Sequence, residues 1–139
     1  MWLASLSRGV TAIGIFLLFG AAMALLAGIT LVRPGTTLDC VWALNPRAYS
    51  QLAPIGKTVG VLFLLLSGAL AVAGMGWLRR KKWGWALAVI IISTQVLGDL
   101  VNALRGQVLQ GFIGVLLAGA LLLYMTRPCV RAVFATKPK

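Results

Sequence analysis

The residues best suited to chemistry in this chain are three polar side chains in the stretch "STQVLGDLVNALRG", residues 93–106. Gln95, Asp99 and Asn102 are spaced i, i+4 and i+7, so in a helix they lie on one face. Asp99 is one of only two acidic residues in the sequence, and its neighbours are mostly apolar. A carboxylate inside a membrane is costly to bury, and it usually belongs to an ion or proton path or pairs with a cation. This polar stripe is therefore the first candidate for a functional site.

Three cations are candidate partners for Asp99. Lys57 opens the second apolar stretch of the chain, Arg105 ends the third, and Arg47 lies in the loop between the first and second. Each side chain is long enough to bring its charge towards Asp99 by snorkelling. The structural interpretation is that Asp99 pairs with one of them or accepts backbone N–H bonds from the loop. The functional interpretations are proton or cation handling, with the two amides of the stripe as neutral ligands, or contact with a partner protein or a bound lipid.

Four apolar stretches position these residues, and each is long enough to cross a hydrocarbon core of about 30 Å. They are residues 10–32, 58–78, 83–104 and 108–125. The 139-residue chain is 60% hydrophobic and 11% charged, with a mean hydropathy of +0.98. This composition predicts a single all-α integral membrane domain, residues 1–139, folded as a transmembrane four-helix bundle. The first stretch is too long for a signal-peptide core and is expected to remain as a span.

The loop "RPGTTLDCVWALNPRAYSQLAPIGK", residues 33–57, is too rich in structural signals to be a bare connector. Asn45 as helix cap and Pro46 at the first helical position predict a short helix that ends near Leu52, before Pro54. Four side chains give the loop an apolar side: Trp42, Leu44, Tyr49 and Leu52. We expect the loop, with its short amphipathic helix, to cover the outer ends of the spans or to lie at the membrane interface, either shielding helix ends or covering a site.

The distribution of positive charge predicts how the spans are oriented. With both termini in the cytoplasm, nine Lys and Arg residues face the cell interior and four face outward, which fits the positive-inside rule. The inner nine are Arg8, Arg79, Arg80, Lys81, Lys82, Arg127, Arg131, Lys137 and Lys139. In this orientation Asp99, about 24 Å along the third span from Trp83, lies in the outer third of the membrane. The loop at residues 33–57 is then extracytoplasmic.

The "RRKK" turn is the densest cluster of charge in the chain. Its side chains, Arg79, Arg80, Lys81 and Lys82, are expected to contact anionic lipid headgroups as well as to set the topology. Trp77, Trp83 and Trp85 bracket the turn, as is typical of an aromatic belt at a membrane interface. The net charge of +11 does not indicate nucleic-acid binding, because the basic residues lie between apolar stretches or at the chain ends.

The sequence lacks most of the residues and motifs that enzymes use for catalysis. The chain has no histidine and no CxxC motif, so we expect no metal and no cofactor. Cys40 and Cys129 fall on opposite sides of the predicted membrane and should be free thiols. No nucleophile stands beside a base, and a lipid or quinone enzyme would need a pocket near Asp39, Trp42 and Arg47. We therefore expect a protein that is not an enzyme.

Small residues mark the surfaces on which the spans would pack, because helices in lipid associate by close backbone approach and interhelical hydrogen bonds. Candidate pairs and rows are Gly20, Ala24 and Gly28 in the first span, Ser67 with Ala71 and Ala69 with Ala73 in the second, and Gly114 with Ala118 in the fourth. We interpret them as packing positions within one chain rather than between chains.

Three blocks of the sequence resemble small four-span bacterial membrane proteins of unknown function, cyanobacterial ones among them. The blocks are "PGTTLDCVWALNPRAYSQLAPIGK", "WGWALAVIIISTQVLGDLVNALRG" and "GALLLYMTRPCVRAVF", and "LNPRAY" and "LGDLVN" are their most specific parts. The resemblance covers roughly residues 33–134 and implies a bacterial inner or plasma-type membrane and a compact four-helix architecture. It carries over no binding or catalytic residues. Small multidrug exporters are a poorer match, since they need a carboxylate in the first span and this chain has none there.

The sequence favours a non-enzymatic membrane protein that acts by binding, as an accessory, structural or assembly subunit of a larger membrane complex. Its expected partners are membrane lipids, some of them anionic, and other membrane proteins or further copies of itself. The alternative is a small transporter or channel that uses the stripe of Gln95, Asp99 and Asn102.

Overall fold

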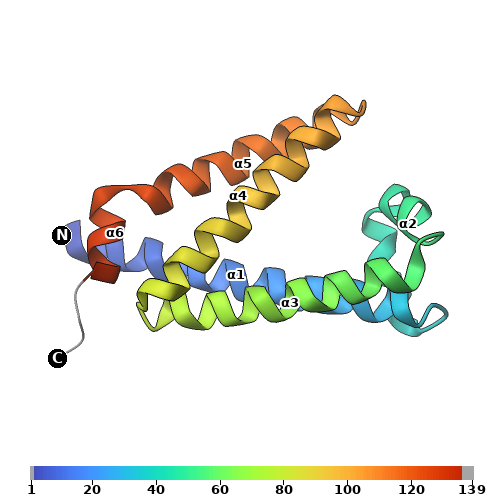
Figure 1. The fold of residues 1–139 in the computed structure, drawn as a ribbon, viewed down its shortest axis with the longest axis horizontal. Coiled ribbons are helices and arrows are strands. Elements are labelled where there is room, and N and C mark those ends of the chain that lie inside the picture. Colours follow the sequence, from blue (N-terminus) through green and yellow to red (C-terminus); the bar gives the residue numbers. More distant parts are fainter. Residues whose placement is uncertain (1, 136–139) are drawn as a thin grey trace. The chain divides into compact units, whose positions relative to one another are not determined.

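The computed structural model describes residues 2–135, and all the regular structure in that range is helical (Figure 1). In chain order the helices are α1 (Trp2–Val32), the 3₁₀-helix η1 (Thr37–Leu44), α2 (Pro46–Leu52), α3 (Gly56–Leu78), α4 (Lys82–Leu104), α5 (Val108–Thr126) and α6 (Pro128–Ala135). Four of them, α1, α3, α4 and α5, are long and apolar enough to cross a membrane. The four predicted spans are confirmed within two residues at each end, except that α1 begins well before residue 10.

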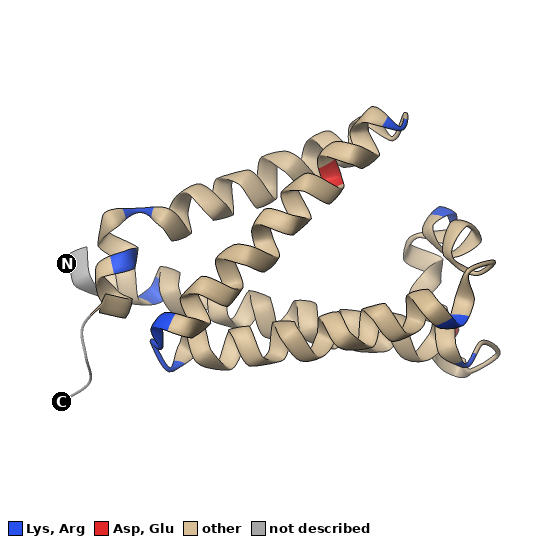
Figure 2. Cartoon of the chain, in the orientation of Figure 1, with Lys and Arg blue, Asp and Glu red and all other residues tan. Residues whose placement is uncertain are grey.

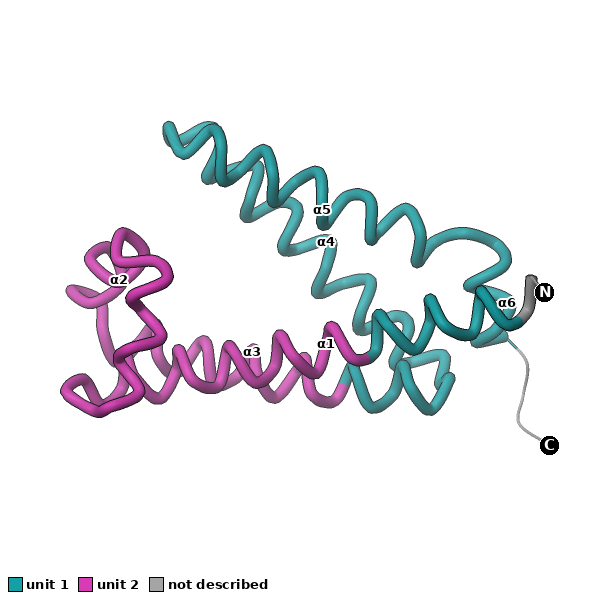
Figure 3. The backbone as a smooth tube through the Cα atoms, turned by 180° about the vertical axis from the view of Figure 1, so that it is seen from behind, with its two compact units in different colours: residues 1–14, 73–139 teal, residues 15–72 magenta. Residues whose placement is uncertain are grey.

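The chain forms two compact units, shown in different colours in Figure 3. The loop unit consists of residues 15–72 and contains most of α1 and α3 with the loop that connects them. The terminal unit combines the described residues of both chain ends, 2–14 and 73–135, and contains α4, α5 and α6. Each unit has its own internal packing.

In the loop unit, α1 and α3 approach each other through glycines. A Cβ added to Gly28 would lie 3.0 Å from the carbonyl oxygen of Gly60, and one added to Gly60 would lie 3.0 Å from the carbonyl oxygen of Gly28. Nearer the middle of both helices, the buried Ser67 hydroxyl donates a hydrogen bond of 2.8 Å to the carbonyl oxygen of Ala21. Gly28 of the predicted packing row is thus confirmed as a contact within one chain, with Gly60 as its unforeseen partner.

The loop at residues 33–57 folds as predicted around its short helix. Asn45 caps α2, since its Oδ1 accepts a 3.2 Å hydrogen bond from the backbone N–H of Ala48. The Trp42 indole donates to the hydroxyl of the buried Thr30 at 2.9 Å, and its ring lies 5.4 Å from that of Tyr49. The hydrogen bond from Trp42 therefore ties the loop to the end of α1. The 3₁₀-helix η1 was not predicted.

In the terminal unit, α4 and α5 form a tight antiparallel hairpin. The closest approach is at Gly111, where an added Cβ would meet the backbone of Asp99 and Ala103 at 2.5–2.7 Å. A second close approach joins Gly76 and Gly84 on either side of the turn between α3 and α4. These glycines let two helix backbones touch where any side chain would hold them apart.

The short helix α6 packs back onto the terminal unit, which the sequence analysis did not predict. Val130 and Phe134, one turn apart, are both buried, and the Phe134 ring lies 4.6 Å from that of Trp77. Trp77 is itself completely buried, and its indole donates a 2.6 Å hydrogen bond to the carbonyl oxygen of Val10. The assignment of Trp77 to an aromatic belt was therefore wrong, because its ring packs inside the protein, whereas Trp83 is 52% exposed and fits a belt.

Candidate functional site

The polar stripe lies in the second half of α4, as its spacing predicted. Gln95 and Asn102 are exposed and Asp99 is half-buried. The Gln95 side-chain amide donates a 3.1 Å hydrogen bond to Oδ1 of Asp99, one helical turn away. The carboxylate is thus held by a neighbour on its own helix, and Oδ2 is left for other partners.

The Asp99 side chain lies against α5 at a position that only glycine leaves open. A Cβ added to Gly114 would lie 2.5 Å from Oδ2 and 2.6 Å from the carboxyl carbon of Asp99. Gly114 was predicted as a packing position, and the structure confirms that role. Its facing partner, the acid itself, was not foreseen. Part of the carboxylate is therefore covered by the backbone of α5, which explains why Asp99 is less exposed than the two amides.

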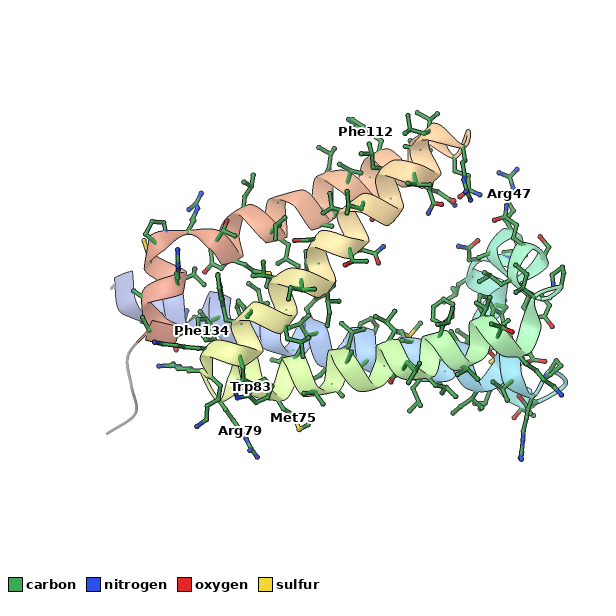
Figure 4. All side chains as sticks on the ribbon, viewed as in Figure 1. Arg47, Met75, Arg79, Trp83, Phe112 and Phe134 are labelled. Atoms are coloured by element: carbon green, nitrogen blue, oxygen red, sulfur yellow. The ribbon has the colours of Figure 1, made fainter. Side chains whose placement is uncertain are left out.

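The three predicted cationic partners of Asp99 fall in different parts of the chain. Arg105 is in the same unit, exposed, at the C-cap of α4 and about 9 Å further along the helix axis. Within the described part of the terminal unit, the partner that the structure gives the carboxylate is Gln95. Lys57 and Arg47 are exposed residues of the loop unit, and Arg47 extends from α2 (Figure 4). Pairing of either with Asp99 stays a prediction.

The stripe can exchange hydrogen bonds but does not form a preassembled metal site. Among residues 2–135 no three His, Cys, Asp or Glu side chains come together to hold a metal ion. Two side-chain amides and one carboxylate offer both donors and acceptors along about 10 Å of helix. Such a surface is suited to another polar surface, or to a transient cation or proton at the carboxylate.

The cationic turn lies where α3 ends and α4 begins, and its four side chains are all exposed (Figure 2). Arg80 adopts a left-handed backbone conformation with φ of 53°, and its guanidinium donates to the Ser7 hydroxyl at 3.5 Å. Next to the turn, the Arg131 guanidinium lies 5.7 Å from the centre of the Trp85 ring. Arg131 was not predicted as a site residue, because its place beside Trp85 depends on the packing of α6, whose buried residues are Val130 and Phe134.

The residues required by an enzymatic alternative do not line the cavity described in the loop unit. In the loop unit a cavity of about 210 Å³ is lined by Thr30, Leu31, Val32, Pro34, Tyr49, Ala53, Gly56 and Lys57. Asp39, Trp42 and Arg47 are not among these lining residues. Asp39 accepts a 2.7 Å hydrogen bond from the Gly35 backbone N–H in the turn after α1, and its other oxygen is buried without a partner among the described residues. Cys40 and Cys129 are free, exposed thiols.

No protein-family model matches the chain, and no curated protein or solved structure is significantly similar to it. The resemblance to four-span bacterial proteins therefore remains a hypothesis drawn from sequence motifs. The function has to be inferred from the residues and their geometry. Lys137 and Lys139, which contribute to the predicted orientation, lie outside the described residues.

Proposed function

We propose that this chain is a non-enzymatic, multi-pass protein of a bacterial plasma-type membrane, with both termini in the cytoplasm, and that it acts as an accessory or assembly subunit of a larger membrane complex. The observation that carries the proposal is the polar face of α4. Gln95 and Asn102 are exposed on a helix that is long and apolar enough to span the bilayer.

Lipid is a poor neighbour for such a face. Hydrocarbon offers no hydrogen-bond partners, and an amide that leaves water without one costs several kcal/mol. A polar surface on another membrane helix supplies those partners, and each interhelical hydrogen bond contributes about 0.6–2 kcal/mol. The stripe is therefore suited to contact another protein.

The side of α4 opposite the polar stripe carries exposed apolar residues and is suited to face lipid. Leu97 is 63% exposed and lies roughly opposite Gln95 on the helical wheel, and Ile90 is 62% exposed. Both are apolar side chains that hydrocarbon solvates well. A subunit that contacts a partner protein through one face of a helix needs a polar face for the partner and an apolar face for the lipid. Helix α4 has both faces.

Site-specific photocrosslinking in native membranes tests the proposal. A photoreactive residue replaces Gln95 in one variant and Leu97 in a matched control on the same turn of α4. The Gln95 position should give a discrete crosslinked species with a second membrane protein, and the Leu97 position should give lipid adducts. Crosslinks confined to one chain, or joining two copies of it, would contradict an accessory role.

The second candidate is a small transporter or channel, and the carboxylate of Asp99 is the observation in its favour. Within the described part of its unit it accepts a hydrogen bond from a neutral amide, so a proton or cation would not have to displace a bound arginine or lysine. Flux of protons or monovalent cations into proteoliposomes should then fall at least tenfold in Asp99→Asn. Flux that is equal in the variant and the wild type would eliminate this function.

A further inference from the structure

We infer that the terminal unit binds the phosphate group of an anionic phospholipid in a cavity between the first turns of α4 and the helix α6. The proposed contact with a partner protein is made at the other end of α4, so this site extends the function rather than depending on it. The site is built from Lys82, Trp85 and Arg131.

The cavity is formed by two helices of the same unit. Its volume is about 340 Å³, at the lower end of the range of about 300–1,000 Å³ that is typical of small-molecule sites. Its lining residues are Lys82, Trp85 and Ala86 from α4, and Arg131, Phe134 and Ala135 from α6. A lining of two cations and four apolar or aromatic residues matches a phosphate headgroup with its glycerol and acyl portion.

The packing of α6 places Arg131 beside the cavity. The buried Val130 and Phe134 fix α6 against the unit, and Phe134 stacks at a tilt on Trp77. The Trp85 indole donates a 3.0 Å hydrogen bond to the carbonyl oxygen of Met125, which orients the ring under the Arg131 guanidinium. A guanidinium presented beside a cavity can bind a phosphate through two parallel hydrogen bonds.

Positive charge is concentrated at this end of the described part of the terminal unit. Six cations belong to the turn and to α6 or its cap, namely Arg79, Arg80, Lys81, Lys82, Arg127 and Arg131. The acidic residue of the terminal unit, Asp99, is about 26 Å from Lys82 along α4, far beyond a screening length of about 8 Å. Figure 2 shows several blue segments around the start of α4, and the red segment towards its end, close to a further blue segment at the α4–α5 turn. This cluster of exposed positive charge attracts anions from outside the protein.

The first turn of α4 favours the same ligand. Its N-cap residue, Lys81, makes no side-chain capping hydrogen bond, and the turn contains no acidic residue. The backbone N–H groups that begin an α-helix have no acceptor within the helix and carry a partial positive charge. These amides add to the attraction of Lys82 and Arg131 for an anion beside them.

The depth of the cavity identifies the phosphate as that of a lipid. Lys82 and Trp85 stand at the start of a helix that is long and apolar enough to span a membrane, which would put the cavity where the hydrocarbon core meets the headgroups. Trp83, labelled in Figure 4, is 52% exposed, as expected for an indole at the headgroup level. Phospholipid phosphates are concentrated at that depth, whereas free phosphate remains in the aqueous phase.

Native mass spectrometry of the full chain, released from detergent with phosphatidylglycerol or phosphatidylcholine, tests the inference. Wild type should retain phosphatidylglycerol, and K82Q/R131Q should bind it about tenfold or more weakly, because hydrogen bonds to charged groups are the strong ones. R105Q, which removes an exposed cation at the opposite end of α4, is the control and should bind like wild type.

Three results would overturn the site. They are equal losses in K82Q/R131Q and R105Q, equal retention of the two lipids by wild type, and displacement of the lipid by millimolar inorganic phosphate, which would assign the cavity to a soluble ligand. If K82Q/R131Q does not fold, a photoreactive phosphatidylglycerol on wild type decides the matter. Its crosslinks should map to residues 82–86 and 131–135, and crosslinks elsewhere would refute the assignment.

Discussion

Replacing Gly111 with alanine should force α4 and α5 apart. The added methyl group would lie 2.5 Å from the backbone nitrogen of Ala103 and 2.6 Å from the backbone oxygen of Asp99. Ordinary van der Waals contact begins at 3.4 Å, so the two helices must separate by up to about 0.9 Å. The obstructing atoms belong to the backbone and cannot rotate away as the end of a side chain can.

The magnitude follows from two opposing terms. Overpacking costs about 1–3 kcal/mol, and the rigid backbone contact puts Gly111→Ala in the upper part of that range. Alanine regains at most about 1 kcal/mol over glycine as a helix former. We therefore expect a net loss of about 1–2 kcal/mol in the free energy of unfolding.

The assay is unfolding of the purified protein in mixed micelles by titration with a denaturing detergent, followed by helix content. Gly119→Ala is the matched control, because it lies on the same helix and an added Cβ there meets nothing within 4 Å. The control should be unchanged or more stable. If both variants unfold at the same detergent fraction, the close approach of α4 and α5 at Gly111 is refuted.

Two further predictions concern buried contacts and orientation. Trp77→Phe removes the indole N–H that donates to a buried carbonyl, so in the same titration it should cost about 1 kcal/mol, whereas Trp83→Phe, at an exposed ring, should change stability by less than about 0.5 kcal/mol. Equal effects would contradict the packing of Trp77. In intact cells a membrane-impermeant maleimide should label the exposed thiol of Cys40 and reach that of Cys129 only after permeabilisation. The reverse pattern would invert the proposed topology.

The four long helices could be predicted because bilayer thickness and backbone hydrogen bonding leave little freedom. A run of about 20 apolar residues must be helical in lipid, since every backbone N–H and C=O needs an internal partner. The Asn45 cap and Pro46 were equally informative, because each acts on backbone within one turn. Local rules of this kind need no knowledge of the tertiary structure.

Contacts between elements could not be predicted in the same way. Helix α6 was not predicted because its eight residues are too few for a membrane span. Its apolar residues Val130 and Phe134 indicate a buried face only once the position of Trp77 beside Phe134 is known. The burial of Trp77 was misjudged for the same reason. A tryptophan near a cationic turn looks the same in sequence whether its ring faces lipid or a neighbouring helix.

The candidate site was predicted in part. Helical periodicity alone places Gln95, Asp99 and Asn102 on one face, and the structure adds the bond between the first two. That Asp99 lies over Gly114 depends on the register between two helices, which a single sequence does not encode in any local pattern. The cavity beside Arg131 requires α6 to be in place, so it was inaccessible to sequence reasoning.

The glycines of the α4–α5 hairpin do more than allow close packing, because they also fix the rotation of α4 about its axis. Successive residues of a helix point about 100° apart. If α4 met Gly111 of α5 one residue further along its sequence, α4 would be rotated by about that angle, and the polar stripe would turn towards the side that carries Leu97 and Ile90. The same rotation would swing Trp85 and Lys82 away from α6, because both ends belong to one rigid helix. The register of one glycine contact therefore controls both the direction in which the stripe faces and the presence of the cavity between α4 and α6.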